Sequence, residues 1–451
     1  MEKIVSSTRL FHEIIAASKP AFEKMCGATP IPRFRAARQS FPTDRVGDVA
    51  AAARAALAAP GCLDRIKPGM RIAIGVGSRG IANLPLLTRE LAAAIRAAGG
   101  EPFIVPAMGS HGGATAEGQA EMLAGLGVDE AACGAPVVSS MEVRQIGETR
   151  MEIKGTPVTI PVYLDAAALD ADGIVLVQRV KPHTAFRGRY ESGLCKMLVI
   201  GLGKHRGAMA YHRYGFGPFA ELMPKVAAQV LRAAPVLFGL AVVENAYHDT
   251  ALVEAVPAAA FLAREPELLE YAFSLMGRLY FDHLDVLIVE EIGKNFSGDG
   301  MDPNITGTFP TPFAGQGLDV ESRVVLRLSE ETHGNAIGLG MADFSTVRAF
   351  LQADPIPTYT NSLTSRVSCV AKVPLLMPDD ETAIKAAIYK STSPTAEVPR
   401  IVKIRNTGNM ELIEISEALW AEAEAHPSVA LEGAPYALRF DAERMLLPEG
   451  A

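Results

Sequence analysis

Cysteine, tryptophan and charged residues are all scarce in this chain of 451 residues. One residue is a tryptophan, charged side chains make up 21% of the sequence, and the five cysteines are Cys26, Cys62, Cys133, Cys195 and Cys369. No two of them form a CxxC pair, and their spacing does not match a zinc site. An odd and sparse set of thiols argues against a disulfide framework and fits the reduced thiols of a cytoplasmic protein.

The sequence also lacks a basic stripe and a long hydrophobic run. Its net charge of −8 is spread along the chain, which argues against a nucleic-acid-binding protein. The longest apolar runs, such as residues 49–60, are rich in alanine and broken by charge or proline, so no membrane span is predicted. Residues 1–20 are charged early and contain no apolar core of a signal peptide. We therefore expect a soluble cytoplasmic protein whose partner is a small molecule.

Apolar residues make up 49% of the chain, which is enough for sizeable cores in two or three domains. Short β-branched runs alternate with segments of helical periodicity, and this alternation predicts an α/β fold with mainly parallel sheets. The predicted strands are residues 71–77, 101–107, 173–180, 237–243, 284–291, 323–328, 367–373 and 401–404. The predicted helices are residues 84–98, 114–126, 217–233, 257–278, 342–352 and 381–389.

The helix predicted at residues 257–278 ends shortly before the strand predicted at 284–291, so it marks a domain boundary. We expect an N-terminal catalytic and cofactor-binding domain of residues 1–275 and a C-terminal α/β domain of residues 276–451. Ligands of parallel sheets gather beyond the carboxyl ends of the strands. The expected active site is therefore a cleft between the two domains, lined by strand ends.

The first candidate segment, Gly75-Val-Gly-Ser78-Arg79-Gly80, ends a predicted strand and precedes a predicted helix. Its backbone N–H groups can hold an anion beside Arg79, with Ser78 and Gly80 as further contacts to a cofactor. The segment is neither a complete GxGxxG fingerprint nor a P-loop. An ordinary strand-to-helix turn with a surface arginine is the alternative interpretation.

His111 lies in a second segment of this kind, residues 107–115, between a predicted strand and a predicted helix. Glycines on both sides leave the imidazole uncrowded and let a ligand approach the backbone closely. Imidazole titrates near neutrality, so it can move a proton in either direction. The alternative is a histidine that caps the following helix or is merely exposed in its loop.

The third segment, residues 180–213, contains His183, Lys196 and His212. His183 leaves the end of an apolar strand, and Lys196 lies among apolar residues. Burial lowers the pKa of a lysine and frees its amine as a nucleophile. His212 lies on a predicted short helix and can ligate a metal as neutral imidazole. Taken singly, Lys196 can instead snorkel from a core helix, and His212 can cap a helix or pack in the core.

The fourth segment, residues 290–307, follows a very apolar strand and is dense in Gly, Asp and Asn. It predicts a long ordered loop that presents Lys294 and Asn295 to the carboxylate of a substrate. The alternatives are a solvated loop or a cation site with oxygen ligands, although the spacing of a calcium loop is absent.

Four features follow one another along residues 71–213: the Arg79 loop, the His111 loop, the His183 strand end, and the pair of Lys196 and His212. This ordered set resembles the nickel-pincer lactate racemase family. The resemblance implies an isomerase that interconverts the two configurations of a 2-hydroxy acid. It also implies a cofactor, the nickel-pincer nucleotide (pyridinium-3-thioamide-5-thiocarboxylic acid mononucleotide) with Ni, and the enzymes that synthesise this cofactor as partners.

The resemblance also implies a role for each matching residue. Lys196 would hold the cofactor covalently through a thioamide, and His212 would be the protein ligand of nickel. His111 and His183 would be the two acid–base residues, and Arg79 would position the cofactor or the substrate. Lys294 is the candidate for the C-terminal lysine of the family.

Racemisation of a 2-hydroxy acid explains why two histidines are needed. Removing the hydroxyl proton while the Cα hydrogen leaves as hydride gives a planar 2-keto acid, and hydride returning to the opposite face gives the other enantiomer. Two bases on opposite sides, His111 and His183, serve this reaction, and a cation such as Arg79 fixes the carboxylate. The charged stretch 187–195 before Lys196 favours a bulkier or more polar substrate than lactate, such as a sugar acid.

Two other classes of function also fit the sequence. A metal-dependent hydrolase or lyase would use His111, His183 and His212 with zinc or manganese, although no HExxH-like pair or carboxylate triad is present. A non-catalytic protein of the same fold would bind a phosphorylated metabolite and show no turnover.

Overall fold

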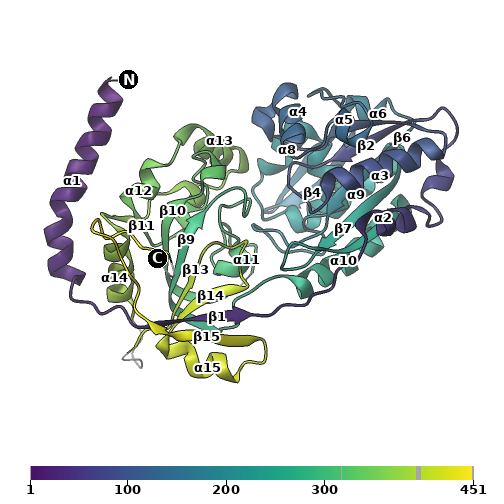
Figure 1. The fold of residues 1–451 in the computed structure, drawn as a ribbon. Coiled ribbons are helices and arrows are strands. Elements are labelled where there is room, and N and C mark those ends of the chain that lie inside the picture. The colour runs from purple at the N-terminus through teal and green to yellow at the C-terminus, as the bar shows by residue number, and fades with distance from the viewer. Residues whose placement is uncertain (1, 316, 393–397, 449–451) are drawn as a thin grey trace. The chain divides into compact units, whose positions relative to one another are not determined.

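A computed structural model describes residues 2–315, 317–392 and 398–448 (Figure 1). The chain forms two compact units, one of residues 42–276 and one that combines residues 1–41 with residues 277–451.

The first residues of the chain belong with its C-terminal part. Strand β1 (Phe34–Gln39) pairs antiparallel with β14 (Leu412–Ser416) on one side and with β15 (Val429–Tyr436) on the other. The expected N-terminal domain of residues 1–275 therefore begins 41 residues before the observed unit and ends one residue before it. Local sequence does not reveal this, because the pairing joins segments from opposite ends of the chain.

The unit of residues 42–276 contains a five-stranded sheet with the order β3-β2-β6-β7-β8. Its strands are β2 (Arg71–Val76), β3 (Glu101–Pro106), β6 (Gly173–Arg179), β7 (Val236–Glu244) and β8 (Thr250–Pro257). The first four strands in this order are parallel, and β8 runs antiparallel to β7. The sheet confirms the predicted α/β class with mainly parallel strands.

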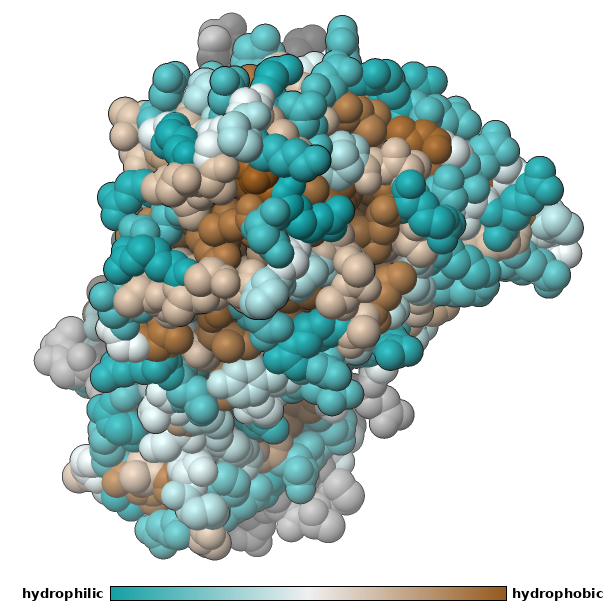
Figure 2. Space-filling view, turned by 90° about the vertical axis from the view of Figure 1, so that its right-hand side faces the viewer, coloured by the Kyte–Doolittle hydropathy of each residue, from teal (hydrophilic) through white to brown (hydrophobic). Residues whose placement is uncertain are grey.

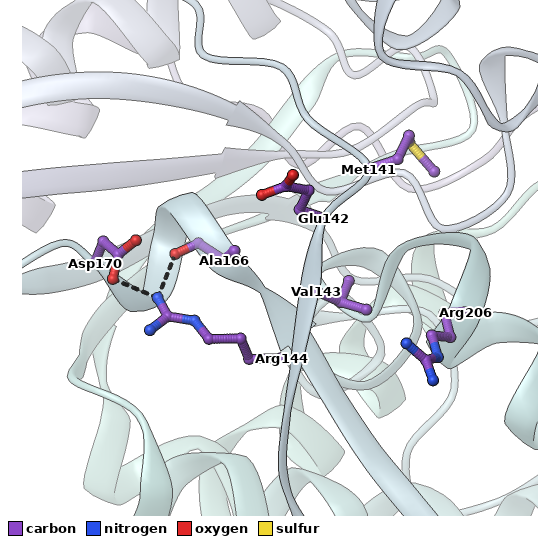
Figure 3. Close-up of a pocket in the computed structure, with 7 residues that line it drawn as sticks. All are labelled: Met141, Glu142, Val143, Arg144, Ala166, Asp170 and Arg206. Atoms are coloured by element: carbon purple, nitrogen blue, oxygen red, sulfur yellow. Dashed lines mark hydrogen bonds and ion pairs between the residues drawn. The ribbon is translucent and has the colours of Figure 1, made fainter.

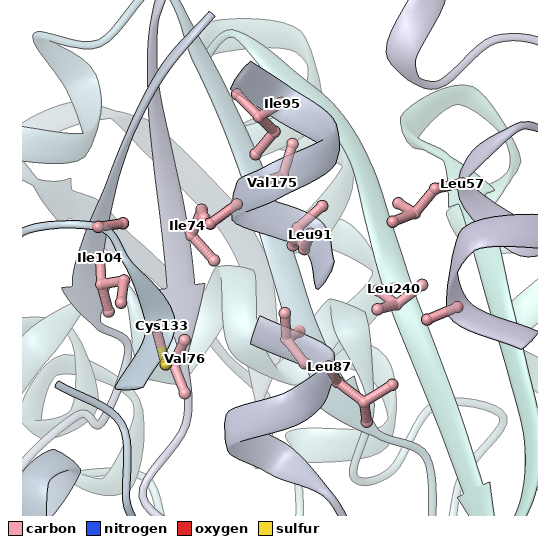
Figure 4. Packing of buried hydrophobic residues seen from close by; sticks show 14 of the residues in the cluster. Leu57, Ile74, Val76, Leu87, Leu91, Ile95, Ile104, Cys133, Val175 and Leu240 are labelled. Carbon is pink, nitrogen blue, oxygen red and sulfur yellow. The ribbon is translucent and has the colours of Figure 1, made fainter. Parts of the chain in front are cut away.

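Helices pack against this sheet because their apolar side chains recur at helical spacing. In α3 (Leu84–Ala97), a proline occupies the first turn, and Leu87, Leu91 and Ile95 are fully buried along one face. They belong to one core cluster with Ile74 of β2 (Figure 4). The other long helices of the unit are α2 (Val49–Leu57), α4 (Ala116–Gly125), α8 (Lys204–His212), α9 (Phe219–Ala233) and α10 (Phe261–Leu275).

A two-stranded antiparallel hairpin, which the sequence did not predict, completes the unit. Its strands are β4 (Val143–Ile153) and β5 (Thr156–Asp165). They are joined by Lys154 and Gly155, both with positive φ (51° and 75°), as a two-residue hairpin turn requires. Only a few positions of β4 are buried, so its sequence lacks the apolar run that marks the central strands.

The other unit contains an eight-stranded sheet with the order β12-β11-β10-β9-β13-β14-β1-β15. The strands β9 (His283–Ile292), β10 (Asp319–Leu328), β11 (Phe344–Thr346), β12 (Leu375–Met377) and β13 (Ile401–Ile404) are parallel. The remaining three strands continue the sheet in antiparallel pairing. Helices of this unit include α1 (Glu2–Cys26), α12 (Val347–Leu351), α13 (Pro355–Ser365), α14 (Asp380–Lys390) and α15 (Trp420–Ala425).

Two predicted elements of this unit are wrong. Residues 367–373 are not a strand but contain a short 3-10 turn, Cys369–Ala371. The helix predicted at residues 342–352 begins as strand β11 and becomes helical only at Val347. Short apolar runs do not distinguish a strand from a helix, and in both places the tertiary pairing decides.

Within the described residues, no helix combines the length and the apolarity that crossing a bilayer requires. The face of the protein in Figure 2 carries hydrophobic patches between hydrophilic side chains.

Candidate functional site

The carboxyl ends of three neighbouring parallel strands carry most of the predicted site residues. Val76, the last residue of β2, is paired with Pro106 at the end of β3 and with Val177 near the end of β6. The loops that follow these strands therefore leave from one edge of the sheet. The Arg79 loop follows β2, the His111 loop follows β3, and the His183 loop follows β6.

The first two loops meet through their side chains. The Oγ of Ser78 and the Nδ1 of His111 are within hydrogen-bonding contact, and both residues are half-buried. His111 precedes a 3-10 turn but its side chain does not cap it, so the capping alternative is not what the structure shows. Gly112, with φ of 65°, lies so close to α4 that a Cβ there would be 2.6 Å from the backbone N of Gln119.

His183, Lys196 and His212 form one cluster. The rings of His183 and His212 both lie against Phe216, with centroid distances of 5.9 and 5.2 Å. Burial holds the pKa of His183 well below its usual range, and the nearby positive charges of Lys196 and His212 lower it further. The imidazole of His183 is therefore neutral at physiological pH.

One hydrogen bond defines which nitrogen of His183 carries the proton. The backbone N–H of Ala185 donates to the Nδ1 of His183 at 3.0 Å. Because Nδ1 accepts, the neutral ring has its proton on Nε2. Charging this ring would place a second proton on Nδ1 and break the bond from Ala185. His111 has no such restriction, since the hydroxyl of Ser78 can either donate or accept.

A buried carboxylate, Glu191, organises the loop of His183. It accepts hydrogen bonds from the backbone N–H of His183 at 2.6 Å and of Gly188 at 3.1 Å. Arg187 pairs with Glu191 at 3.4 Å and also donates to the carbonyl oxygen of His183 at 2.6 Å. Arg187 and Glu191 are thus used to hold this loop, so the charge of the stretch 187–195 does not by itself indicate a polar substrate.

Lys196 lies at an irregular point of the backbone. The short helix α7 (Leu194–Lys196) passes into a π-helix, Met197–Gly201, before α8 begins. A π-helix costs regular hydrogen bonding and often accompanies functional sites. The Nζ of Lys196 is 3.4 Å from the Oγ of Ser192, and the side chain is half-buried.

The beginning of this segment rests on a second buried carboxylate, Glu265 of α10. Its Oε2 accepts a hydrogen bond from the backbone N–H of Cys195 at 2.8 Å. Gly193 packs against the same carboxyl group, where a Cβ would lie 2.6 Å from the Cδ of Glu265. Burial raises the pKa of Glu265 to about 7, although the bond from Cys195 lowers it.

This pKa predicts a pH-dependent contribution of Glu265 to stability. The native carboxyl binds its proton more tightly than the unfolded one, so the free energy of unfolding falls as the pH rises from about 4.5 to about 7. The isosteric change Glu265→Gln removes this penalty. Relative to the wild type, we expect the variant to gain roughly 3 kcal/mol at pH 8 and almost nothing at pH 4.

Urea unfolding of both proteins at the two pH values measures this difference. A gain of equal size at both pH values would show that the effect does not come from ionisation of Glu265.

The Arg79 loop is held at the same edge of the sheet. Glu244, at the end of β7, accepts from the backbone N–H of Ala82 at 2.6 Å and pairs with Arg179 of β6. Ser78 and Arg79 are half-buried and Gly80 is exposed. A Cβ at Gly77 would lie 3.3 Å from the Sδ of Met197, the residue after Lys196. This contact brings the Arg79 loop beside the segment that carries Lys196.

Lys294 and Asn295 belong to the other unit, after β9. The Nζ of Lys294 donates to the carbonyl oxygen of Gly298 at 2.6 Å. Asn295 is exposed, and its Oδ1 accepts from the hydroxyl of Ser329 at 2.8 Å. Their contact with a substrate, and the cleft between domains that it would require, stay predictions.

Several buried charged residues near the candidate site residues were not predicted, although two of them lie in the segment 180–213. Glu191 and Lys204 are inside residues 180–213, but nothing in the sequence distinguishes them from the other charged residues there. Glu265 lies in a helix with charged neighbours, which is typical of an exposed face. Burial distinguishes all three, and only the fold decides burial.

A polar recess of about 470 Å³ lies elsewhere in this unit (Figure 3). It is lined by Met141, Glu142, Val143, Arg144, Ala166, Asp170 and Arg206. Arg144 pairs with Asp170 and donates to the carbonyl oxygen of Ala166 at 2.9 Å, so this guanidinium is already engaged. None of the predicted site residues lines the recess.

In the part of the chain that the structure describes, no group of three or more His, Cys, Asp or Glu side chains is placed to hold a metal ion. His111, His183 and His212 are therefore not assembled there as a set of three ligands, which the metal-dependent hydrolase or lyase would need.

The fold and the site together define an α/β protein with a lysine–histidine cluster at the carboxyl edge of a parallel sheet. No protein-family model and no curated protein matches the chain.

The solved structures with distant likeness to the chain include the following two. One is a protein from Thermotoga maritima, at 12% identity and a TM-score of 0.49, over 77% of this chain and 94% of that one. The other is the lactate racemase apoprotein from Thermoanaerobacterium thermosaccharolyticum, at 14% identity and a TM-score of 0.44, over 86% of this chain and 93% of that one. Likeness at this level assigns no activity to the chain.

Proposed function

We propose that the chain is a racemase or epimerase of a 2-hydroxy acid that works with a nickel-pincer nucleotide. The observation that carries this proposal is the cluster of His183, Lys196 and His212, with His111 joined to the same sheet edge through Ser78. An amine, a neutral imidazole and a second imidazole in one place are the residue types that the resemblance implies.

The residues present fit such a cofactor. Lys196 offers a half-buried amine for covalent attachment, and His212 offers an imidazole nitrogen as the protein's ligand to nickel. One protein ligand is sufficient, because the cofactor brings its own sulfur and carbon donors. Ser78, Arg79 and Gly80 at the end of β2 would bind its phosphate through backbone N–H groups and the guanidinium. When bound, the cofactor supplies the acceptor and donor of hydride.

The histidines would move the hydroxyl proton of the substrate. His111 can take up this proton at Nε2 without losing its partner, because its Nδ1–H can donate to the hydroxyl of Ser78 in both the neutral and the charged ring. His183 presents a proton on Nε2 and can donate a hydrogen bond to the substrate oxygen. To accept a proton at Nε2, its ring must release the bond from Ala185. The two histidines would therefore act in turn, each facing one enantiomer.

Charged groups would orient the substrate. Arg79 would bind its carboxylate or the cofactor phosphate, and Lys294 and Asn295 are the proposed substrate contacts from the other unit. A carboxylate fixed by such contacts would hold the reacting carbon toward the cofactor.

Mass spectrometry of the Lys196 peptide tests the proposal. The protein is produced together with the enzymes that synthesise the cofactor, and it is then analysed for nickel and for a cofactor-sized mass on Lys196. We expect both, together with interconversion of 2-hydroxy acid enantiomers. Activity from unmodified, nickel-free protein would contradict the proposal, and activity that needs only zinc or manganese would favour the hydrolase or lyase.

A further inference from the structure

Lys204, near the candidate site, carries a fully buried charge, since its side chain is 0% exposed. Its ammonium group is 3.1 Å from the Oδ2 of Asp165, which is also fully buried. It donates to the carbonyl oxygen of Pro106 at 2.5 Å and to the Oε1 of Gln119 at 3.1 Å. The buried ammonium group therefore has one ion-pair partner and two hydrogen-bond acceptors.

These partners join elements that carry different site residues. Pro106 ends β3, immediately before the His111 loop, and Gln119 lies in α4, immediately after that loop. The Nε2 of Gln119 donates to the carbonyl oxygens of Gly109 at 3.0 Å and His111 at 3.2 Å. Gln119 therefore links Lys204 to the backbone of His111, because it accepts a hydrogen bond from the first and donates one to the second.

Lys204 itself begins α8, the helix that ends at His212. Its backbone has a φ of 51°, the left-handed region that favours glycine. A buried cation in a strained conformation is not a favourable way to fill a core, because an apolar side chain of similar volume avoids the desolvation of two charges. The buried Lys204 is therefore better explained by its hydrogen bonds to Pro106 and Gln119 than by a contribution to the stability of the fold.

We propose that Lys204 is a positioning residue that fixes the His111 loop relative to the helix of His212. The expected effect of Lys204 on catalysis rests on the proposed function. The order of the loop itself is a property of the chain without cofactor.

Hydrogen exchange of the cofactor-free protein tests the positioning. The variants are Lys204→Met, Gln119→Met, and Lys204→Met combined with Asp165→Asn, which removes both charges but keeps the cap that Asp165 gives to Ala168. We expect peptides covering residues 107–119 to exchange about tenfold faster in all three. Peptides covering the His183 loop should exchange as in the wild type, because Glu191 holds that loop independently.

Lys225→Met is the matched control, since Lys225 is a surface lysine paired with Glu221 four residues earlier. The double variant should recover most of the thermal stability lost in Lys204→Met while the loop stays loose. Wild-type exchange of residues 107–119 in Gln119→Met, or a loop restored in the double variant, would overturn the proposal.

In the loaded protein, Gln119→Met should lower kcat about tenfold and leave KM and the mass on Lys196 unchanged. A loosened loop in a protein whose wild type has no racemase activity would refute the proposed function and leave the positioning role of Lys204 intact. A loosened loop with wild-type kcat would refute the catalytic consequence.

Discussion

Lys196→Ala is expected to abolish the proposed covalent adduct and nearly all of the proposed racemase activity. The change removes the Nζ atom through which the proposed cofactor would be attached. The variant could then hold the cofactor only by reversible, non-covalent binding. We expect activity to fall by at least about 10³-fold, and nickel to be lost on gel filtration. Intact-mass measurement, nickel content and chiral chromatography of the products check the three parts separately.

Lys181→Ala is a demanding control for this prediction. Lys181 is also half-buried, and its charge also lowers the pKa of His183, so it shares the electrostatic surroundings of Lys196. Its backbone pairs with Ser192, four residues before Lys196. The control should keep the adduct and most of the activity. An adduct found on Lys181, or one that survives Lys196→Ala, would show that the anchor has been misassigned.

The sequence was most informative where a strand is buried on both faces. Runs such as residues 71–77 and 284–291 contain the apolar residues of a central parallel strand, and both are strands. The pairing of β1 with β14 could not be predicted from the sequence, because the register between distant segments depends on the assembled sheet. The hairpin of β4 and β5 was missed for a different reason, since exposed strands lack a continuous apolar run.

The position of several candidate site residues in the fold could be predicted from the sequence because they follow strand ends. His111 and His183 were singled out as polar residues next to glycine or proline after apolar runs, and parallel pairing brings their loops to one edge. The supporting carboxylates and Lys204 could not be found this way. Their signal is burial, and Glu265 and Lys204 also have a partner far away in the sequence, as in the contact of Glu265 with Cys195.

Replacing either of the proposed acid–base residues, His111 or His183, by glutamine should lower the proposed racemisation by about 10²- to 10⁴-fold while the proposed adduct on Lys196 remains. Glutamine keeps a polar side chain but cannot carry a proton between substrate and solvent. Because the two enantiomers of a 2-hydroxy acid with one stereocentre are equal in free energy, kcat/KM must fall by the same factor in both directions. His248→Asn is the control, since His248 is exposed with a φ of 64°, which asparagine tolerates.

The two glutamine variants should nevertheless differ in which enantiomer they can still convert to the 2-keto acid. His111 and His183 would each face one enantiomer, so the first half of the reaction, formation of the planar 2-keto acid, should survive for one enantiomer in His111→Gln and for the other in His183→Gln. Rapid-quench detection of the keto acid from each pure enantiomer measures this. Loss of keto-acid formation from both enantiomers in His111→Gln, with formation from both retained in His183→Gln, would mean that one histidine alone handles the proton. In that case His183, with its proton fixed on Nε2 by Ala185, would be a hydrogen-bond donor to the substrate and His111 the base.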